Sequence, residues 1–402
     1  MVTYPSDWTE SKLLDHVNLV QGLTYTPENV KPSGTLVLRS SNIQNGTLSL
    51  LDNVYVNVNV SEEKMVQPGD ILVCVRNGSS ALIGKSCILP KLSNTTFGAF
   101  MSVLRGDTTG FFAKLFESVI VQEQVRGRSN ATINQITKKD FQSIEVTVPS
   151  EPEQKDIAQT LGFFDAYIAD LTELIEKKCG IRDGALEDLI CHRTRIDGFN
   201  DEWTTVSFNQ VITPKARIGW QGLKKHEYLR SGYSYLIGGT DFSHGTVSLD
   251  NIWYVSKDRY DMDANIQVSE NDVLVTKDGT IGKVALVPEL GKPATLNSGV
   301  FVFRTNNRLL PTFLFRVLSS SVFREFIDTL SAGSTIKHLY QKDLKNFEFE
   351  IPVDKKEQAA IADTLTAMDE EIETLEIERN KMIQIREGAM DDLLTGRVRL
   401  GV

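Results

Sequence analysis

The feature that most constrains this chain is an internal repeat with a spacing of 204 residues. Residues 153–196 and 357–400 share 18 identities in 44 positions without a gap, whereas chance would give roughly 3 at ordinary residue usage. The two copies open with Glu153-Gln154 and Glu357-Gln358. A repeat this strong means that the chain folds as two related units, each using the same structural solution.

Weaker similarity precedes each of these segments. Residues 70–73 match residues 272–275, residues 83–85 match residues 281–283, and Trp8-Thr9 matches Trp203-Thr204. The chain therefore divides into two diverged bodies, each followed by a well-matched segment. We predict a first body at 1–150, a helical spacer at 151–197, a second body at 198–352 and a second helical spacer at 353–402. This pattern of divergence indicates that the spacers share one task and that the bodies perform two variants of another.

Each well-matched segment has the apolar spacing of a coiled coil. In the first copy the apolar residues follow one another in steps of 4, 3, 4, 3 and 4, which predicts helices of roughly 40 residues, about 60 Å long. Two similar units related by a pseudo-twofold axis would place these helices antiparallel. The alternative is that each apolar stripe docks on its own body. The heptad positions singled out are Ile157, Leu161, Ile168, Leu171, Ile361, Leu365, Ile372 and Leu375.

The bodies themselves have the pattern of an α+β fold. Short β-branched runs such as residues 54–60, 71–75 and 273–275 are separated by Gly and Asn turn signals, which is typical of strands. A helix is expected in each body, over residues 111–121 and 312–329. We therefore predict two α+β bodies in tandem, each with a mixed or antiparallel sheet, separated by two long helices that form an antiparallel coiled coil.

The net charge of −10 does not exclude a nucleic-acid partner, because of where the charge lies. Residues 151–200 hold 6 basic and 11 acidic residues, and residues 353–402 hold 7 and 12. The whole deficit lies in these two segments, so both bodies are electrically balanced and either can carry a basic face.

Polar loop clusters recur at matching places in the two bodies. Arg and Lys can donate to guanine, Asn and Gln can bond adenine, and Lys can contact phosphate. For a single residue the alternative is an ordinary solvated loop side chain, and the argument for DNA contact rests on the recurrence. The candidate DNA-binding residues are Arg39, Ser41, Asn42, Arg76, Asn77, Lys85, Arg128, Asn134, Thr240, Lys277, Thr280, Lys283, Thr335, Lys337, His338 and Tyr340.

Catalytic and metal-binding motifs are missing from the sequence. Residues 78–86 resemble a phosphate-binding loop but have five residues between the glycines instead of four. The five histidines have no metal-ligand spacing, and the sequence holds no G-x-G-x-x-G, G-x-S-x-G or H-E-x-x-H motif. An Asn-Pro-Pro-aromatic stretch, with which an amino-methyltransferase would hold a flipped adenine, is also missing. We therefore predict no catalytic residue and no metal site.

The sequence also indicates the compartment. The four cysteines form no C-x-x-C pair, so we expect reduced thiols. The start of the chain lacks the features of a signal peptide and no apolar run is long enough to span a membrane. A cytoplasmic location is expected.

The order of these motifs resembles the specificity subunit of a type I restriction-modification enzyme, over almost the entire chain. The second unit runs from residues 333–337 through Lys342-Asp343-Leu344 and Ile351-Pro352 to Glu357-Gln358, and the first unit repeats this order from Thr132-Ile133 to Glu153-Gln154. The resemblance implies two target-recognition domains, each reading one half of a bipartite DNA site, with the helices fixing the spacer between the halves.

The same resemblance implies partners. Two modification subunits would dock on the helices and supply S-adenosylmethionine binding and N6-adenine methylation, so this chain itself would be non-catalytic and without a cofactor. A restriction subunit can join such a complex to cleave unmodified DNA. Two other hypotheses stay open: a two-headed scaffold that binds peptides or glycans across a coiled-coil spacer, and a self-contained methyltransferase or nuclease, which the missing motifs disfavour.

Overall fold

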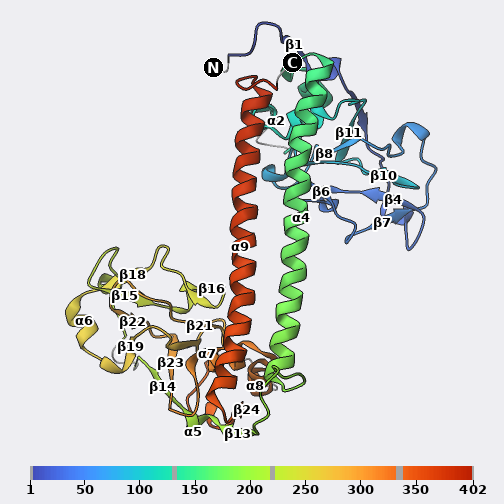
Figure 1. The fold of residues 1–402 in the computed structure, drawn as a ribbon. Helices are drawn as coiled ribbons and strands as arrows, with labels where there is room; N and C mark the ends of the chain where they lie inside the picture. The colour runs from blue at the N-terminus through green and yellow to red at the C-terminus, as the bar shows by residue number, and fades with distance from the viewer. Residues whose placement is uncertain (1–2, 129–133, 218–221, 332–337, 401–402) are drawn as a thin grey trace. The chain divides into compact units, whose positions relative to one another are not determined.

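The computed structural model describes residues 3–128, 134–217, 222–331 and 338–400. The chain forms two compact units, one of Met1–Thr172 with Ile377–Val402 and one of Glu173–Glu376. Two 40-residue helices, α4 (Glu151–Ile190) and α9 (Lys355–Leu394), each contribute to both units (Figure 1). The predicted domain boundaries at 150, 197 and 352 stay a prediction, because the compact units are divided within the helices.

In the described residues, the first body is built from short strands and the α-helices α1, α2 and α3. Its elements are β1 (Thr9–Lys12), β2 (Asn18–Gln21), β3 (Val30–Lys31), β4 (Thr35–Leu38), β5 (Ile43–Gln44), β6 (Thr47–Leu48), β7 (Val54–Val56), β8 (Ile71–Cys74), β9 (Ser86–Ile88), β10 (Thr95–Phe97), β11 (Met101–Arg105), α1 (Phe111–Glu117), α2 (Val119–Arg128), α3 (Lys138–Gln142) and β12 (Glu145–Val148). The strands form sheets of order β2-β11-β8-β9 and β10-β4-β7-β3, together with the pairs β1-β12 and β5-β6.

The second body repeats this plan. Its elements are β13 (Trp203–Ser207), α5 (Phe208–Val211), β14 (Ile212–Ala216), β15 (Ser234–Ile237), β16 (Phe242–Ser243), β17 (Thr246–Val247), β18 (Trp253–Val255), α6 (Lys257–Asp261), β19 (Gln267–Val268), β20 (Val273–Thr276), β21 (Val284–Leu286), β22 (Ala294–Leu296), β23 (Val300–Thr305), α7 (Pro311–Ser319), α8 (Ser321–Ser331) and β24 (Glu348–Pro352). Its sheets run β14-β23-β20-β21-β17-β16 and β18-β15-β22-β19, with the pair β13-β24.

The two bodies share the strand order of one sheet, and the predicted tandem α+β fold is confirmed. The order β2-β11-β8-β9 of the first body returns as β14-β23-β20-β21 in the second. Both bodies contain mixed sheets, because β10 pairs parallel with β4 and β22 pairs parallel with β15, whereas most other pairs are antiparallel. The weak sequence similarity upstream of the helices therefore reflects one common fold.

The helix predicted in each body is instead two helices. Ser118 separates α1 from α2 with an extended backbone, and Ser320 separates α7 from α8 in the same way. Each serine is buried and its hydroxyl donates to a carbonyl three residues back, at 2.6 Å for Ser118 and 2.8 Å for Ser320. A buried hydroxyl that bonds the preceding turn offers the backbone an alternative to continuing the helix. The predictions over 111–121 and 312–329 therefore missed one break in each body, and the first of them also ended seven residues before the end of α2.

The heptad stripes pack partly on the bodies. Ile157 and Leu161 lie in the core of the first unit, and Ile361 and Leu365 lie in the core of the second, all at most 1% exposed. Their apolar groups are thus already covered within the chain, as in the alternative that the sequence left open. Leu171 and Ile372 are also buried, and Ile168 and Leu375 are half-buried.

Contacts between the two long helices establish their antiparallel direction. In the first unit Asp165 of α4 bonds Arg386 of α9, and Tyr167 bonds Glu378. In the second unit Lys178 of α4 pairs with Glu371 of α9 at 2.7 Å. Residue numbers rise along α4 while those of the contacted residues fall along α9, so the predicted antiparallel pairing is confirmed.

Two further properties bear on the expectations from sequence. Nowhere in the described parts of the chain does a helix have both the length and the apolar character that crossing a bilayer requires. The four cysteines are free thiols, two buried in the strands β8 and β9 and two half-buried on or just after α4.

Candidate nucleic-acid interface

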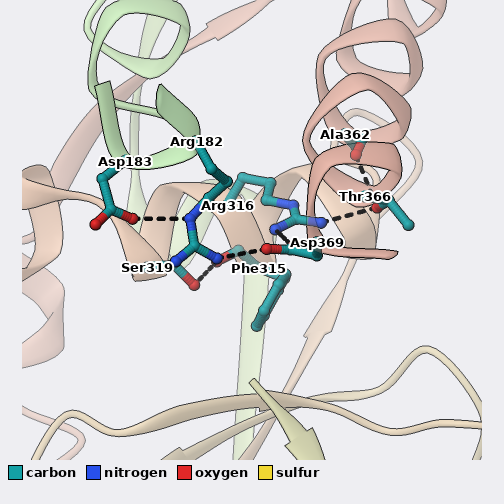
Figure 2. A network of polar contacts seen from close by, with 8 residues as sticks. All are labelled: Arg182, Asp183, Phe315, Arg316, Ser319, Ala362, Thr366 and Asp369. Atoms are coloured by element: carbon teal, nitrogen blue, oxygen red, sulfur yellow. Dashed lines mark hydrogen bonds and ion pairs between the residues drawn. The ribbon is translucent and has the colours of Figure 1, made fainter. Parts of the chain in front are cut away.

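In the second unit, one carboxylate joins the body to both long helices, as Figure 2 shows. Asp369 of α9 accepts from Arg316 of α7, with 2.5 Å between Nη1 and Oδ2, and also from Arg182 of α4. Arg316 donates its other nitrogen to Thr366 at 2.8 Å. We call this set the Asp369 network. The arrangement fixes the first helix of the α7–α8 pair against the spacer.

The first unit repeats the arrangement with different partners. Asp165 of α4 accepts from Lys114 of α1 and from Arg386 of α9, both at 2.5 Å. Arg386 also donates to Glu117 at 2.9 Å. Asp165 and Asp369 are separated by the 204-residue repeat, as are Arg182 and Arg386. We call this set the Asp165 network.

A second pair of networks lies where each long helix begins. Glu153 is buried and accepts from Arg399 at 2.5 Å, and Arg399 also bonds Asp7 at 3.0 Å. The matching residue of the second unit, Glu357, is buried and accepts from Arg195 at 2.7 Å and from the indole of Trp203 at 3.2 Å. Buried charges of this kind need partners, and here the partners come from the segment that follows the other helix.

These networks explain much of the repeat. Docking of a shared partner, which the resemblance implied, is not the only reason for the similarity of the spacers, because several repeated polar residues bind other parts of the same chain. Their signal was present as identities between the two copies at positions outside the apolar heptad. What the sequence did not show is that lysine and arginine residues of the bodies complete the networks.

The predicted DNA-binding loops of the first body come together at the end of β8. We call residues 39–42, 76–80, 98–100 and 134–136 loop cluster 1. Asn77 donates its backbone N–H to the Asn134 carbonyl at 3.1 Å and its side-chain amide to Ser40 Oγ at 3.1 Å. Lys85 reaches the Ser40 carbonyl at 3.5 Å. Three loops that lie far apart in the sequence therefore form one surface.

The single candidates of the first body differ in their surroundings. Arg39 pairs with Asp52 at 2.7 Å, and Arg128 at the end of α2 donates to Ser143 at 2.7 Å. Asn42 is fully buried and donates to the Ser49 carbonyl at 2.9 Å. Its amide is used inside the loop, so Asn42 holds the loop in shape instead of facing a ligand, in contrast to the prediction. Ser41 is half-buried, with its hydroxyl oxygen enclosed.

The second body gathers its loops in the same way. We call residues 238–241, 277–283, 297–299 and 338–340 loop cluster 2. Leu339 donates its N–H to the Lys277 carbonyl at 2.8 Å, and the carboxylate of Asp278 lies 2.6 Å from Nδ1 of His338. Thr240, Thr280 and Lys283 are exposed, Lys277 is half-buried with Nζ 5.6 Å from the ring centroid of Phe301, and Tyr340 is exposed. Thr335 and Lys337 lie outside the described residues.

A buried cation lies beside loop cluster 2. Arg217 donates to the Leu296 carbonyl at 2.9 Å, next to Asn297. Burial lowers the pKa of Arg217 to about 10, and the charge of Arg259 adds to this effect. The guanidinium remains protonated at neutral pH and contributes positive potential at this edge of the body.

The two clusters can hydrogen-bond base edges and phosphates. Arginine, lysine, asparagine, glutamine and histidine side chains supply donors, and the loop positions leave them accessible at the end of a rigid sheet. Within the residues that the structure describes, no group of three His, Cys, Asp or Glu side chains is arranged to hold a metal ion. The assignment of individual residues to DNA contacts stays a prediction.

Comparison with known proteins places these observations in a family. The family model described as the type I restriction modification DNA specificity domain matches residues 5–178 and again residues 200–384. The EcoKI specificity subunit of Escherichia coli K12 is 32% identical over 166 residues, which cover 39% of this chain and 36% of that protein. The MjaVIII specificity subunit of Methanocaldococcus jannaschii is 23% identical over 423 residues, covering 98% and 94%.

Solved structures agree at the level of the fold. The S subunit of a type I restriction-modification system from M. genitalium covers 96% of each chain with a TM-score of 0.61 at 16% identity. A second solved structure, which describes complex assembly and conformational transition of the type I R-M system, covers 99% of this chain and 100% of that chain with a TM-score of 0.57 at 14% identity. The two matches to the family model together span most of the length of this chain. The chain therefore belongs to the family of type I restriction-modification DNA specificity subunits and carries two copies of the specificity domain.

Proposed function

We propose that this chain gives a type I restriction-modification complex its DNA sequence specificity, with each body reading one half of a bipartite site. The observation that carries the proposal is the recurrence of one loop cluster, on the same sheet end, in two copies of one domain. Two readers on one chain recognise two short sequences, and a contiguous motif would not need the duplication.

The proposed role of the long helices is to set the spacer between the half-sites. Each helix has 40 residues and belongs to both units without a break, and an α-helix of that length extends about 60 Å. The networks around Asp165 and Asp369 join each body to both helices. A body held in this way cannot turn freely about its own part of the helices, and in this proposal the length of the helices sets the spacer between the half-sites.

Exposed apolar side chains on α4 support docking of partner subunits. Phe163, Tyr167, Leu174 and Ile181 are between 40% and 66% exposed, and the last three are separated by seven residues each. A stripe of exposed apolar side chains at heptad spacing is a surface for another helix. The spacers also hold the whole net negative charge of the chain, which favours a partner with a basic surface.

In this proposal the catalytic work belongs to the partners. Two modification subunits bind the spacers and bring S-adenosylmethionine and N6-adenine methylation, and a restriction subunit joins to cleave unmethylated DNA. The chain itself is non-catalytic and needs no cofactor. The supporting observation is its relatedness over nearly full length to proteins named as specificity subunits.

The experiment is methyl transfer to a random DNA library by the purified complex, compared with each component alone. We expect methylation at a bipartite motif by the complex and none by this chain alone. Methyl transfer by the lone chain would contradict the non-catalytic assignment, and methylation without a bipartite motif would contradict the two-reader proposal.

Docking is tested separately by placing a charge on the stripe. Leu174→Glu is expected to abolish co-purification of the modification subunits. Ala169→Glu is the matched control, because Ala169 is also exposed on α4 but lies about half a turn away from Leu174 around the helix. Equal binding by both variants would contradict docking on this face.

A further inference from the structure

We infer, resting on the proposed function, that three matched positions in each body read the bases and that their chemistry differs between the half-sites. The positions are Arg76, Phe100 and Gln135 in the first body, and Asp278, Gly299 and His338 in the second. The first set is suited to a guanine and the second to a base that presents an amino group, with cytosine as the expected partner.

The backbone frame around these positions is the same in both bodies. In the first body Val75 donates to the Phe100 carbonyl at 3.0 Å and accepts from the N–H of Ile136 at 2.9 Å. In the second body Lys277 donates to the Gly299 carbonyl at 2.8 Å and accepts from the N–H of Leu339 at 2.8 Å. The residue after the central strand is therefore held between the same two loops in each case.

Opposed residues in this frame point to the same face. Arg76 forms an isolated antiparallel bridge with Gln135, and Asp278 forms the matching bridge with His338. Directly opposite residues of an antiparallel pair project their side chains together on one face. The distance of 2.6 Å between Asp278 Oδ1 and His338 Nδ1 agrees with this geometry. The backbone frame and the direction of the opposed side chains are thus the same in the two bodies. The bodies differ in the identity of these side chains.

In the first body the frame presents hydrogen-bond donors on an aromatic support. Phe100 is 57% exposed, and the guanidinium carbon of Arg76 lies 5.1 Å from its ring centroid. Stacking on a ring fixes the plane of the guanidinium, which loses less entropy when its fork then bonds a planar acceptor. An arginine fork matches O6 and N7 of guanine in the major groove, and a glutamine can bond adenine beside it.

In the second body the frame presents an acceptor. Asp278 carries a carboxylate where the first body has Arg76, and His338 occupies one of its oxygens. Gly299 stands where the first body has Phe100, so no side chain at this position covers the Asp278 carboxylate, whose side chain is 37% exposed. A carboxylate accepts from the exocyclic amino group of cytosine and repels the acceptor edge of guanine. The two half-sites should therefore differ at the corresponding base pair.

The main alternative is that Arg76 contacts only phosphate. A phosphate contact depends on charge, so Arg76→Lys would preserve it, whereas a bidentate contact to guanine depends on the planar fork. The lysine variant therefore separates the two roles. Asp278→Asn plays the same part in the second body, because an asparagine amide is matched to adenine.

The test uses the complete complex with its modification subunits and records the DNA sequences that it enriches from a random library. For Arg76→Lys we expect discrimination at one G·C pair of one half-site to fall by about 5- to 100-fold, with the other half-site unchanged. For Asp278→Asn we expect the preference at one position of the other half-site to move from C towards A. Arg308→Lys and Asp258→Asn, exposed positions outside both clusters, are the charge-matched controls and should leave the motif intact.

The unaltered half-site in each variant shows that the complex is folded and assembled. The inference is overturned if Arg76→Lys keeps the wild-type motif, if either variant changes both half-sites, or if the controls have the same effect as the variants. A wild-type complex that enriches no bipartite motif would overturn the proposed function and this inference together, whereas an intact wild-type motif with unaffected variants would overturn the inference alone.

Discussion

Replacing Asp369 by asparagine tests whether the Asp369 network holds the second body on the spacer. The side chain of Arg316 is only 8% exposed, whereas that of Asp369 is 34% exposed. Breaking a buried ion pair by removing one partner costs about 3–5 kcal/mol. Because water reaches the carboxylate, we expect a smaller loss of about 2–4 kcal/mol in the free energy of unfolding.

The magnitude has a thermal equivalent and two internal comparisons. For a unit of this size, 1 kcal/mol shifts Tm by about 2–4 °C, so Asp369→Asn should lower the Tm of the second unit by about 4–16 °C. Asp165→Asn should cost less in the first unit, because Arg386 keeps Glu117 at 2.9 Å. Glu370→Gln removes the same charge from an exposed neighbouring position and should change the stability by less than about 0.5 kcal/mol.

The assay is urea unfolding followed by tryptophan emission, to which Trp203 and Trp253 of the second unit contribute. A double-mutant cycle with Arg316→Met isolates the pairwise energy, which should exceed about 1 kcal/mol for residues in direct contact. If Asp369→Asn is as stable as Glu370→Gln, or if the two substitutions in the cycle are additive, the network does not stabilise the unit and the reasoning is refuted.

Three further predictions concern other parts of the chain. Burial raises the pKa of the Cys87 thiol to about 12, with a contribution from Glu117. At pH 8 iodoacetamide should therefore modify the two half-buried cysteines before Cys87. Equal modification rates, measured by mass spectrometry, would contradict this. Gly396→Ala should destabilise the first unit by about 1–3 kcal/mol, because φ is +70° and the new Cβ would lie 2.5 Å from Pro5. In the control Gly388→Ala the new Cβ has no neighbouring atom within 4 Å, so this substitution should be neutral or stabilising. Four residues inserted at the unit boundary of both α4 and α9 lengthen each helix by about 6 Å. The DNA between the two half-sites of the enriched motif should then be longer by about one or two base pairs. An unchanged distance between the half-sites would contradict the proposed role of the helices.

The sequence predicted what depends on periodicity and repetition. Heptad spacing was enough to find both long helices, and a repeat of 204 residues was enough to predict two copies of one fold. The helix breaks at Ser118 and Ser320 were not predictable, because serine also occurs within helices, and here each break accompanies a buried hydroxyl that bonds the preceding turn. That depends on packing, which the local sequence does not contain.

The candidate interface was predictable in outline and not in detail. Recurring polar loops indicated segments that the fold brings together in each body, but Asn42 has the same chemistry as an exposed asparagine and only the fold shows that it is buried. Phe100 carried no signal, because an aromatic residue between two strands usually belongs to the core. Its exposure beside Arg76 follows from the turn between β10 and β11.

The most direct test of the account is to exchange one reader. Residues 1–150 are replaced by the matching body of another specificity subunit, and the methylated motif is determined by sequencing genomic DNA from cells that also produce the modification subunits. The account predicts that one half of a bipartite motif changes while the other half and the spacer length stay the same. A change in both halves, or in neither, would contradict the claim that the two bodies read DNA independently.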